Sequence, residues 1–452
     1  MNGKELLHPA LGPCVVTKLI GNGEVEVSFP TLGIRGKRYR LAALVDPDTG
    51  GAPTISNGQR GSTKTEQSAE TLGAIGESML KARLAILALR LGQCPEGYID
   101  QLTVGAQDIK DACEWALARS GEGKPAVVVF ESPFGKGKTH ALNLFSSLAR
   151  RQFRAVGSVV LDGLGISLME PMSLLSNLAE SIRFPDGQGF ETLPERLCEL
   201  VQHRRVDGLR GRGAAFLADC LDRVPPEIAE QPDAWEIVVD YLSCVLPASQ
   251  AKQMLASYRD RDGAPALPAI VANRVDERAP RCTKMLREWA QACTLVGAHR
   301  GLVVLFDEAD VDYGNTGFGQ AAVARRALLY QAIRGLAKSN ERSYLSIGIA
   351  ITPSSDNYWG ENPIDEILGH LGDECTRHVP LRDLSKRDFV KLGKNVAALY
   401  AEAFGDIVLS PDEAGAKAEE LRSRMETRIN DSCLPRRFIR EFIEQLDLAA
   451  LK

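Results

Sequence analysis

The chain has 452 residues, of which 44% are hydrophobic and 25% are charged, and its formal net charge is −5. This composition is typical of a soluble globular protein, and the length predicts two or three domains rather than one. A negative net charge gives no general attraction to nucleic acid, so any surface that binds DNA has to be local.

The ten cysteines are scattered singly, without a C-x-x-C pair or a Cys/His group at zinc spacing. This usage favours a reducing compartment and disfavours a structural metal. The first residues, MNGKELLHPALG, lack the basic-then-apolar pattern of a signal peptide, and no apolar run approaches the roughly 20 residues that cross a bilayer. We therefore expect a cytoplasmic protein that does not enter a membrane.

Short alternating strands dominate residues 1–45. Residues 24–29 (EVEVSF) alternate polar and apolar side chains, and Asn22-Gly23 before them is a strong hairpin signal. The segment predicts a small SH3- or Tudor-like β-barrel. Its last strands carry a basic hairpin that is either a charge-protected edge or a face for nucleic acid or a partner, with cations at Arg35, Lys37, Arg38 and Arg40.

Residues 46–75 are rich in Gly, Ser, Thr and Pro and predict a flexible linker. Apolar residues at helical spacing then predict a helix over 76–91 and a second over 106–119. We interpret residues 76–120 as a helical lead-in to a core domain that extends over residues 76–385.

The stretch AVVVF-ESPFGKGKTH-ALNLF organises the core. Residues 126–130 predict a strand buried on both faces, and a helix begins near Ala141. The Gly-rich loop between them is typical of a phosphate-binding loop, in which Lys138 reaches the β- and γ-phosphates of ATP and Thr139 holds Mg²⁺. Ser132 stands where such loops usually begin with glycine, and a surface turn is the simpler alternative. The expected nucleotide contacts are Ser132, Pro133, Phe134, Gly135, Lys136, Gly137, Lys138, Thr139 and His140.

A second core strand is predicted over residues 154–162, and residues from about 165 to 300 predict a helical insertion in the core. Within the insertion, residues 203–213 form a basic, Gly-containing loop. It is either a solvated loop or, as the minority interpretation, a contact for DNA or a partner.

GLVVLFDEAD, residues 301–310, has the Walker B pattern of a buried strand that ends in two acids. Asp307 is the candidate ligand of Mg²⁺, and Glu308 is the candidate general base that polarises the attacking water. An acidic cap on the next helix is the structural alternative.

The strand predicted over residues 344–352 ends in Thr352. In ATPases with an extra strand between the two Walker strands this tip senses the γ-phosphate, so Thr352 is our candidate and Ser354 the second; a plain strand end is the alternative. Arg377 lies where AAA+ proteins place a finger toward the neighbouring subunit, although an intramolecular salt bridge explains it equally well.

Residues 386–452 predict an all-helical lid. Ser385 and Asp388 have capping-box spacing at its start. Arg436 and Arg437 open the last helix, where AAA+ lids carry an arginine that reaches the phosphates; a basic solvated turn is the alternative.

Four stretches together resemble the smaller P-loop ATP-binding proteins of BREX-type phage-defence islands, which are encoded beside a helicase. They are residues 85–109, 131–142, 301–310 and 434–447. More distantly, the layout is similar to that of origin-recognition-type AAA+ ATPases. The resemblance implies a three-layer α/β P-loop ATPase of the additional-strand type, with ATP and Mg²⁺ as ligands.

The expected activity is ATP hydrolysis that couples nucleotide state to DNA or to a partner helicase or methylase in antiviral defence. Two alternatives stay open: a nucleotide-gated scaffold with little hydrolysis, and a DNA-binding adaptor that acts through the N-terminal barrel. Assembly into a homo-oligomer, with Arg377 acting between subunits, is also left open.

Overall fold

The computed structural model describes two compact units, residues 106–383 and residues 1–105 together with 384–452. Secondary structure alone is described for strands β1–β4 and for residues 66–75, 320 and 434. Backbone and side chains are described for residues 76–163, 165–185, 192–258, 267–270, 274–295, 300–313, 321–353, 363–405, 408–426 and 435–450.

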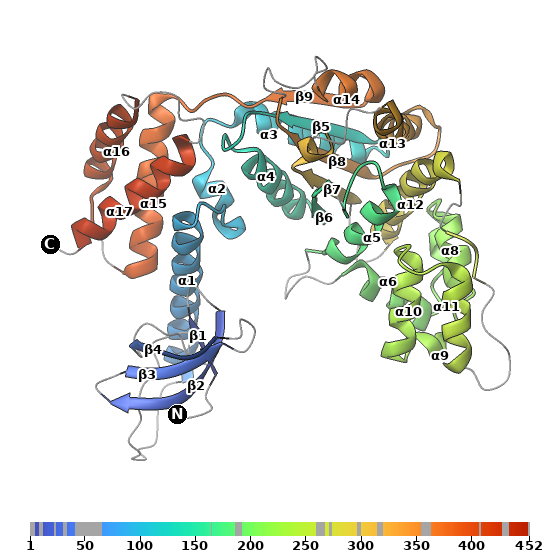
Figure 1. Ribbon diagram of the computed structural model, residues 1–452, viewed down its shortest axis with the longest axis horizontal. Coiled ribbons are helices and arrows are strands. Elements are labelled where there is room, and N and C mark those ends of the chain that lie inside the picture. The colour runs from blue at the N-terminus through green and yellow to red at the C-terminus, as the bar shows by residue number, and fades with distance from the viewer. Residues whose placement is uncertain are drawn as a thin grey trace. The chain divides into compact units, whose positions relative to one another are not determined.

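Near the N-terminus, four strands form an antiparallel sheet in chain order (Figure 1). They are β1 (Glu5–His8), β2 (Gly12–Gly21), β3 (Glu24–Phe29) and β4 (Ile34–Arg40). Gly21 lies opposite Glu24, so β2 and β3 pair as the expected hairpin. Closure into a barrel stays a prediction, and the basic side chains of β4 and residues 46–65 of the predicted linker lie outside the described residues. The rest of the predicted linker, residues 66–75, is helical instead and belongs to α1 (Glu66–Arg90), so the helix begins earlier than the predicted start at residue 76.

The larger unit is built on a five-stranded parallel sheet in the order β6-β7-β8-β5-β9. The strands are β5 (Ala126–Glu131), β6 (Ala155–Val160), β7 (Leu302–Asp307), β8 (Leu345–Ile351) and β9 (Thr376–Pro380). The three central strands are almost wholly buried, as their largely apolar sequences predict. Strand β8 therefore lies between β5 and β7, where an additional strand was expected.

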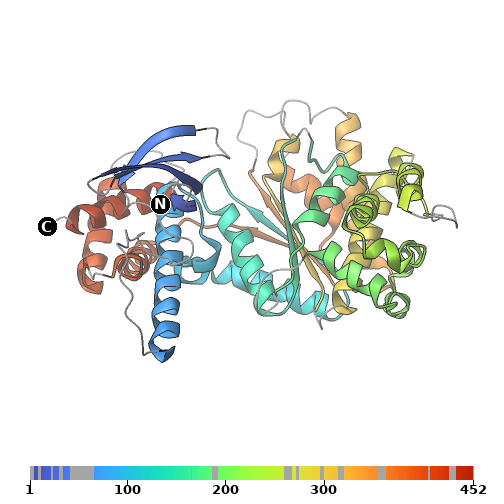
Figure 2. The same ribbon diagram turned by 90° about the horizontal axis from the view of Figure 1, so that it is seen from below.

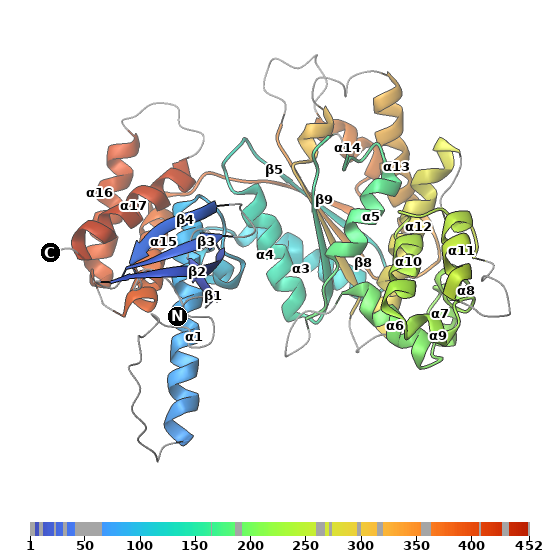
Figure 3. The same cartoon turned by 60° about the horizontal axis from the view of Figure 1, so that its bottom comes forward.

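Helices cover both faces of this sheet, which gives three layers (Figures 1 and 3). On one face Phe130 of β5 packs edge-to-face against Phe145 of α4. The alternate residues Val127 and Val129 point to the other face. The covering helices are α3 (Gln107–Gly121) and α4 (Lys138–Arg151) on the first face, and α5 (Pro171–Ser181), α12 (Val275–Leu295), α13 (Gln320–Lys338) and α14 (Pro363–Leu371) on the second.

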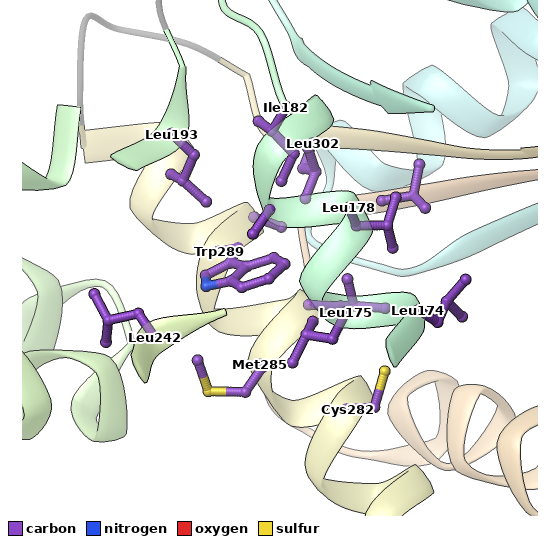
Figure 4. Close-up of a cluster of buried hydrophobic side chains, with 14 of the residues drawn as sticks. Leu174, Leu175, Leu178, Ile182, Leu193, Leu242, Cys282, Met285, Trp289 and Leu302 are labelled. Carbon is purple, nitrogen blue, oxygen red and sulfur yellow. The ribbon is translucent and has the colours of Figure 1, made fainter. Parts of the chain in front are cut away.

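Between β6 and β7 the described chain is helical. Its core centres on Trp289 of α12, which is 1% exposed and packs among leucines of α5 and side chains of the neighbouring helices (Figure 4). Besides α5 and α12, the segment contains α6 (Leu193–Gln202), α7 (Asp207–Gly211), α8 (Ala215–Leu221), α9 (Pro226–Ala229), α10 (Pro232–Leu242) and α11 (Ala248–Leu255).

The C-terminal helices share their core with the helix that was predicted to lead into the sheet domain. Ile86 and Leu89 of α1 are buried in one cluster with Phe389, Phe438 and further side chains of the last three helices. The helices are α1 (Glu66–Arg90), α2 (Ile99–Leu102), α15 (Lys386–Phe404), α16 (Pro411–Glu426) and α17 (Leu434–Ala450).

This packing corrects the predicted domain boundary: residues 76–105 join residues 384–452, not the core over 76–385. The apolar face of α1 was visible in the sequence, but its partner was not.

The predicted capping box is present, since the Ser385 hydroxyl accepts from the Asp388 amide and the Asp388 carboxylate accepts from the Ser385 amide. Figure 2 shows the same helices from below. Among the described helices, none is long and apolar enough to cross a bilayer.

Candidate nucleotide-binding site

Three adjacent strands of the larger unit bring the predicted site residues to one edge of the sheet. Strands β5, β8 and β7 are parallel neighbours, so their carboxyl ends meet. The Gly-rich loop follows β5, Asp307 ends β7, and Thr352 follows β8. Ligands of open α/β sheets bind outside the carboxyl ends of the strands, so this edge is the place for a site.

The Gly-rich loop has the backbone that its glycines allow. Gly135 and Gly137 have φ values of 79° and 102°, in the left-handed region that side chains disfavour. Gly137 is the N-cap of α4, so the free amides of the helix start face the loop. Ser132 is 2% exposed and does not adopt a left-handed conformation. The serine is therefore accommodated without backbone strain.

Lys138 is held inside this corner, 8% exposed. Its Nζ donates to the carbonyl of Ser132 at 3.2 Å and to Oγ1 of Thr352 at 2.6 Å. Burial lowers the pKa of the amine from its usual value, and three nearby carboxylates oppose that shift. The carboxylates belong to Asp310, Asp307 and Glu308.

Thr139 and Asp307 form the second link. The Thr139 hydroxyl donates to Oδ2 of Asp307 at 2.7 Å, across 168 residues of sequence. Asp307 is 7% exposed, at the end of the fully buried strand β7. A hydroxyl and a carboxylate are the hard oxygen donors that Mg²⁺ prefers, so these two residues fit the metal of a P-loop site.

Glu308 has an unusual backbone. Its φ is 56°, and its amide donates to Oδ1 of Asp307 at 2.9 Å. A non-glycine residue in this region costs about 1–3 kcal/mol and persists where the surrounding structure enforces it, often at functional sites. The Glu308 side chain is exposed, so its carboxylate is open to water beside the buried Asp307.

The other side chains of the loop lie in different surroundings. Pro133 and Phe134 are exposed, Phe134 by 62%. Lys136 forms an ion pair with Asp383 at 2.6 Å. His140 lies in the first turn of α4, and burial lowers its pKa to about 4, so it is neutral at pH 7.

Two acids join this edge without having been assigned a role from the sequence. Asp310 accepts the amide hydrogen of Thr352 at 3.1 Å, and Oε2 of Glu131 lies 2.5 Å from Nε2 of His378. Asp310 stood within the GLVVLFDEAD motif, three residues after Asp307, so the motif itself contained the signal. No local pattern connects Glu131 with His378.

Each of the three predicted arginines contacts residues of its own unit. Arg377 is in the middle of β9, opposite Val128, and its guanidinium lies 4.6 Å from the centre of the Trp115 ring. Arg436 packs over Gly92, and Arg437 pairs with Glu441 at 2.7 Å, both within the unit of the C-terminal helices. Their roles stay predictions, and Ser354 lies outside the described residues.

One arginine of the basic loop, residues 203–213, pairs with carboxylates inside and outside the loop. Arg210 contacts the carboxylates of Asp207, Asp219 and Asp222. These pairs offset the charge of Arg210, and both interpretations of the loop stay predictions.

Known proteins add no identification. A scan with models of protein families finds no match to the chain, and a search of curated proteins finds none either. The geometry at the edge of the sheet is therefore the basis for inferring what the chain does.

Proposed function

We propose that the chain is a P-loop ATPase of the additional-strand, AAA+-like type that binds and hydrolyses Mg·ATP. The observation that carries the proposal is the hydrogen bond from Thr139 to Asp307 at 2.7 Å, directly beside the buried Lys138. Two separate motifs predicted a phosphate-binding lysine and a metal-binding pair. The fold brings them together at the strand ends, where α/β proteins bind ligands.

The excess of carboxylates around Lys138 favours binding of a divalent cation together with the nucleotide. One ammonium faces the carboxylates of Asp307, Glu308 and Asp310, and the other lysine of the loop, Lys136, is already paired. A triphosphate brought to this edge without a cation would meet net negative charge. Mg²⁺ held by Thr139 and Asp307 would neutralise phosphate oxygens and stabilise the charge that develops during transfer. Chelation with EDTA should therefore abolish nucleotide binding.

Each residue then has a defined task. Lys138 exchanges its present acceptors, the Ser132 carbonyl and the Thr352 hydroxyl, for phosphate oxygens. The amides of the loop and of the α4 start bind the phosphates through the backbone. Glu308 takes a proton from the attacking water, since its carboxylate is exposed next to the metal-binding Asp307.

The output of hydrolysis is proposed from the resemblance to BREX-type ATP-binding proteins. Nucleotide state would be coupled to DNA or to a partner helicase or methylase in bacterial antiviral defence. The C-terminal helices would act as the lid, with Arg436 or Arg437 reporting on the phosphates, and the N-terminal strands would close into a small barrel that recruits the partner. Arg377 would act in a homo-oligomer.

The test is steady-state ATP hydrolysis with and without duplex or single-stranded DNA. Wild type is compared with Lys138→Ala, with Glu308→Gln and with a control, Lys252→Ala, an exposed lysine of α11. We expect Lys138→Ala to lose nucleotide binding, and Glu308→Gln to bind ATP but to hydrolyse it at least about 100-fold more slowly.

Hydrolysis by Glu308→Gln at the wild-type rate would refute the assignment of the base. Bound ATP without turnover in wild type, under every condition, would favour the nucleotide-gated scaffold. Salt-dependent DNA binding that is indifferent to both nucleotide-site variants would favour the adaptor.

A further inference from the structure

Asp310 links the tip of β8 to the segment that follows β7. It lies in the 3₁₀ turn Ala309–Tyr313, directly after the Walker B acids, and its Oδ1 accepts the amide of Thr352 at 3.1 Å. The hydroxyl of Thr352 lies 2.6 Å from Nζ of Lys138. A continuous line of hydrogen bonds therefore runs from Asp310 through Thr352 to Lys138.

The sheet itself leaves the Thr352 amide without a ladder partner. The register of β8 with β7 ends at Ile349, and its register with β5 ends at Ile351 opposite Glu131. Thr352 is the next residue, beyond both ladders. A buried or half-buried amide without an acceptor is costly, and the Asp310 carboxylate supplies that acceptor.

We infer that Asp310 is a positioning residue for ATP hydrolysis: it fixes the backbone at Thr352 so that the threonine hydroxyl faces the phosphate-binding lysine. The inference rests on the proposed function. When a phosphate oxygen replaces Thr352 as the acceptor of the Lys138 ammonium, the Thr352 hydroxyl stays in position to hydrogen-bond the transferred phosphoryl group. A displacement of about 1 Å at such a contact can lower a rate by about 100-fold while substrate binding persists.

The experiment measures kcat and KM for ATP in the full chain. Asp310→Ala removes the acceptor, and Asp310→Asn keeps an oxygen that can accept the Thr352 amide. We expect Asp310→Ala to lower kcat by about 10- to 100-fold with KM within about threefold of wild type, and Asp310→Asn to restore kcat to within about threefold. Asp373→Ala, which changes an exposed aspartate in the turn before β9, is the matched control.

A double-mutant cycle separates positioning from a general loss of structure. If Asp310 acts through the threonine hydroxyl, Asp310→Ala should add less than about twofold to the loss in Thr352→Ala. The inference would be overturned if the double variant lost kcat by the product of the losses in the two single variants. It would also be overturned if Asp310→Ala kept the wild-type kcat. An Asp310→Asn variant as slow as Asp310→Ala would also overturn it, because the charge and not the acceptor would then matter.

Separate measurements test whether each variant folds and whether the wild-type chain hydrolyses ATP. Melting temperatures identify a variant that fails to fold. If Asp310→Ala fails to fold, Asp310→Leu replaces it as the variant without an acceptor, and its kcat and KM are compared with those of Asp310→Asn by the same criteria. ATP turnover absent from wild type would overturn both proposals. Turnover present in wild type but insensitive to Asp310 would overturn this inference alone.

Discussion

Arg326 joins three elements behind the candidate site, and its removal should destabilise the larger unit. The side chain is 1% exposed and makes a two-pronged contact with Glu366 of α14 at 3.1 and 3.0 Å. It also donates to the carbonyl of Asp312 at 2.9 Å and lies 4.0 Å from the centre of the Tyr313 ring. Both of those residues belong to the turn Ala309–Tyr313, which follows Asp307 and Glu308.

Arg326→Ala would leave the carboxylate of Glu366, a side chain only 10% exposed, without its main partner. Breaking a buried ion pair in this way costs about 3–5 kcal/mol. With about 2.1 cal/mol/K of unfolding entropy per residue, each kcal/mol lowers the melting temperature of a unit of this size by about 1.7 °C, so the shift should be at least about 5 °C. The assay is calorimetric or circular-dichroism melting, repeated in a urea titration.

The neighbouring Arg325 provides the matched control. It pairs with Glu170 at 3.5 Å, and both side chains are more than 40% exposed. A surface pair of this kind contributes about 0–1 kcal/mol, so Arg325→Ala should melt within about 3 °C of wild type. Equal melting temperatures for Arg325→Ala and Arg326→Ala would refute the reasoning. Arg326→Met with Glu366→Leu should recover part of the loss, because no charge is then left unpaired.

Three further predictions concern the loop and the first turn of α4. Gly137→Ala should weaken nucleotide binding at least about tenfold by equilibrium dialysis, because alanine at φ 102° forces the loop to change shape. Ser132→Gly should leave nucleotide affinity within about threefold, since Ser132 is not left-handed; a large gain in affinity would show that the serine does constrain the loop. His140 has a pKa lowered to about 4 by burial, below the ordinary value near 6.5, so the unfolded chain binds its proton more readily. Stability should therefore fall as the pH drops from about 6.5 towards 4, and His140→Gln should flatten that part of the curve in pH-dependent melting; an unchanged curve would contradict the assignment.

The sequence predicted the parts of this protein that depend on local pattern. Apolar runs rich in Val, Ile and Leu indicate strands β5, β7 and β8, since strands that are buried on both faces are near-continuously hydrophobic. Gly135 and Gly137 mark the left-handed positions of the loop, and the acids at Asp307 and Glu308 mark a strand end. Each of these signals is contained within a few consecutive residues, so it can be identified from the sequence without knowing what the segment packs against.

Only the tertiary structure decided which of these segments meet. Lys138 and Thr352 are 214 residues apart, and their contact depends on β8 lying between β5 and β7. The burial of α1 with α15 and α17, and not with the sheet, likewise depends on which apolar faces pack together. The same is true of Arg377 over Trp115. Periodicity shows that a face is apolar or that a side chain is charged, but the choice of partner is made by packing across the whole fold.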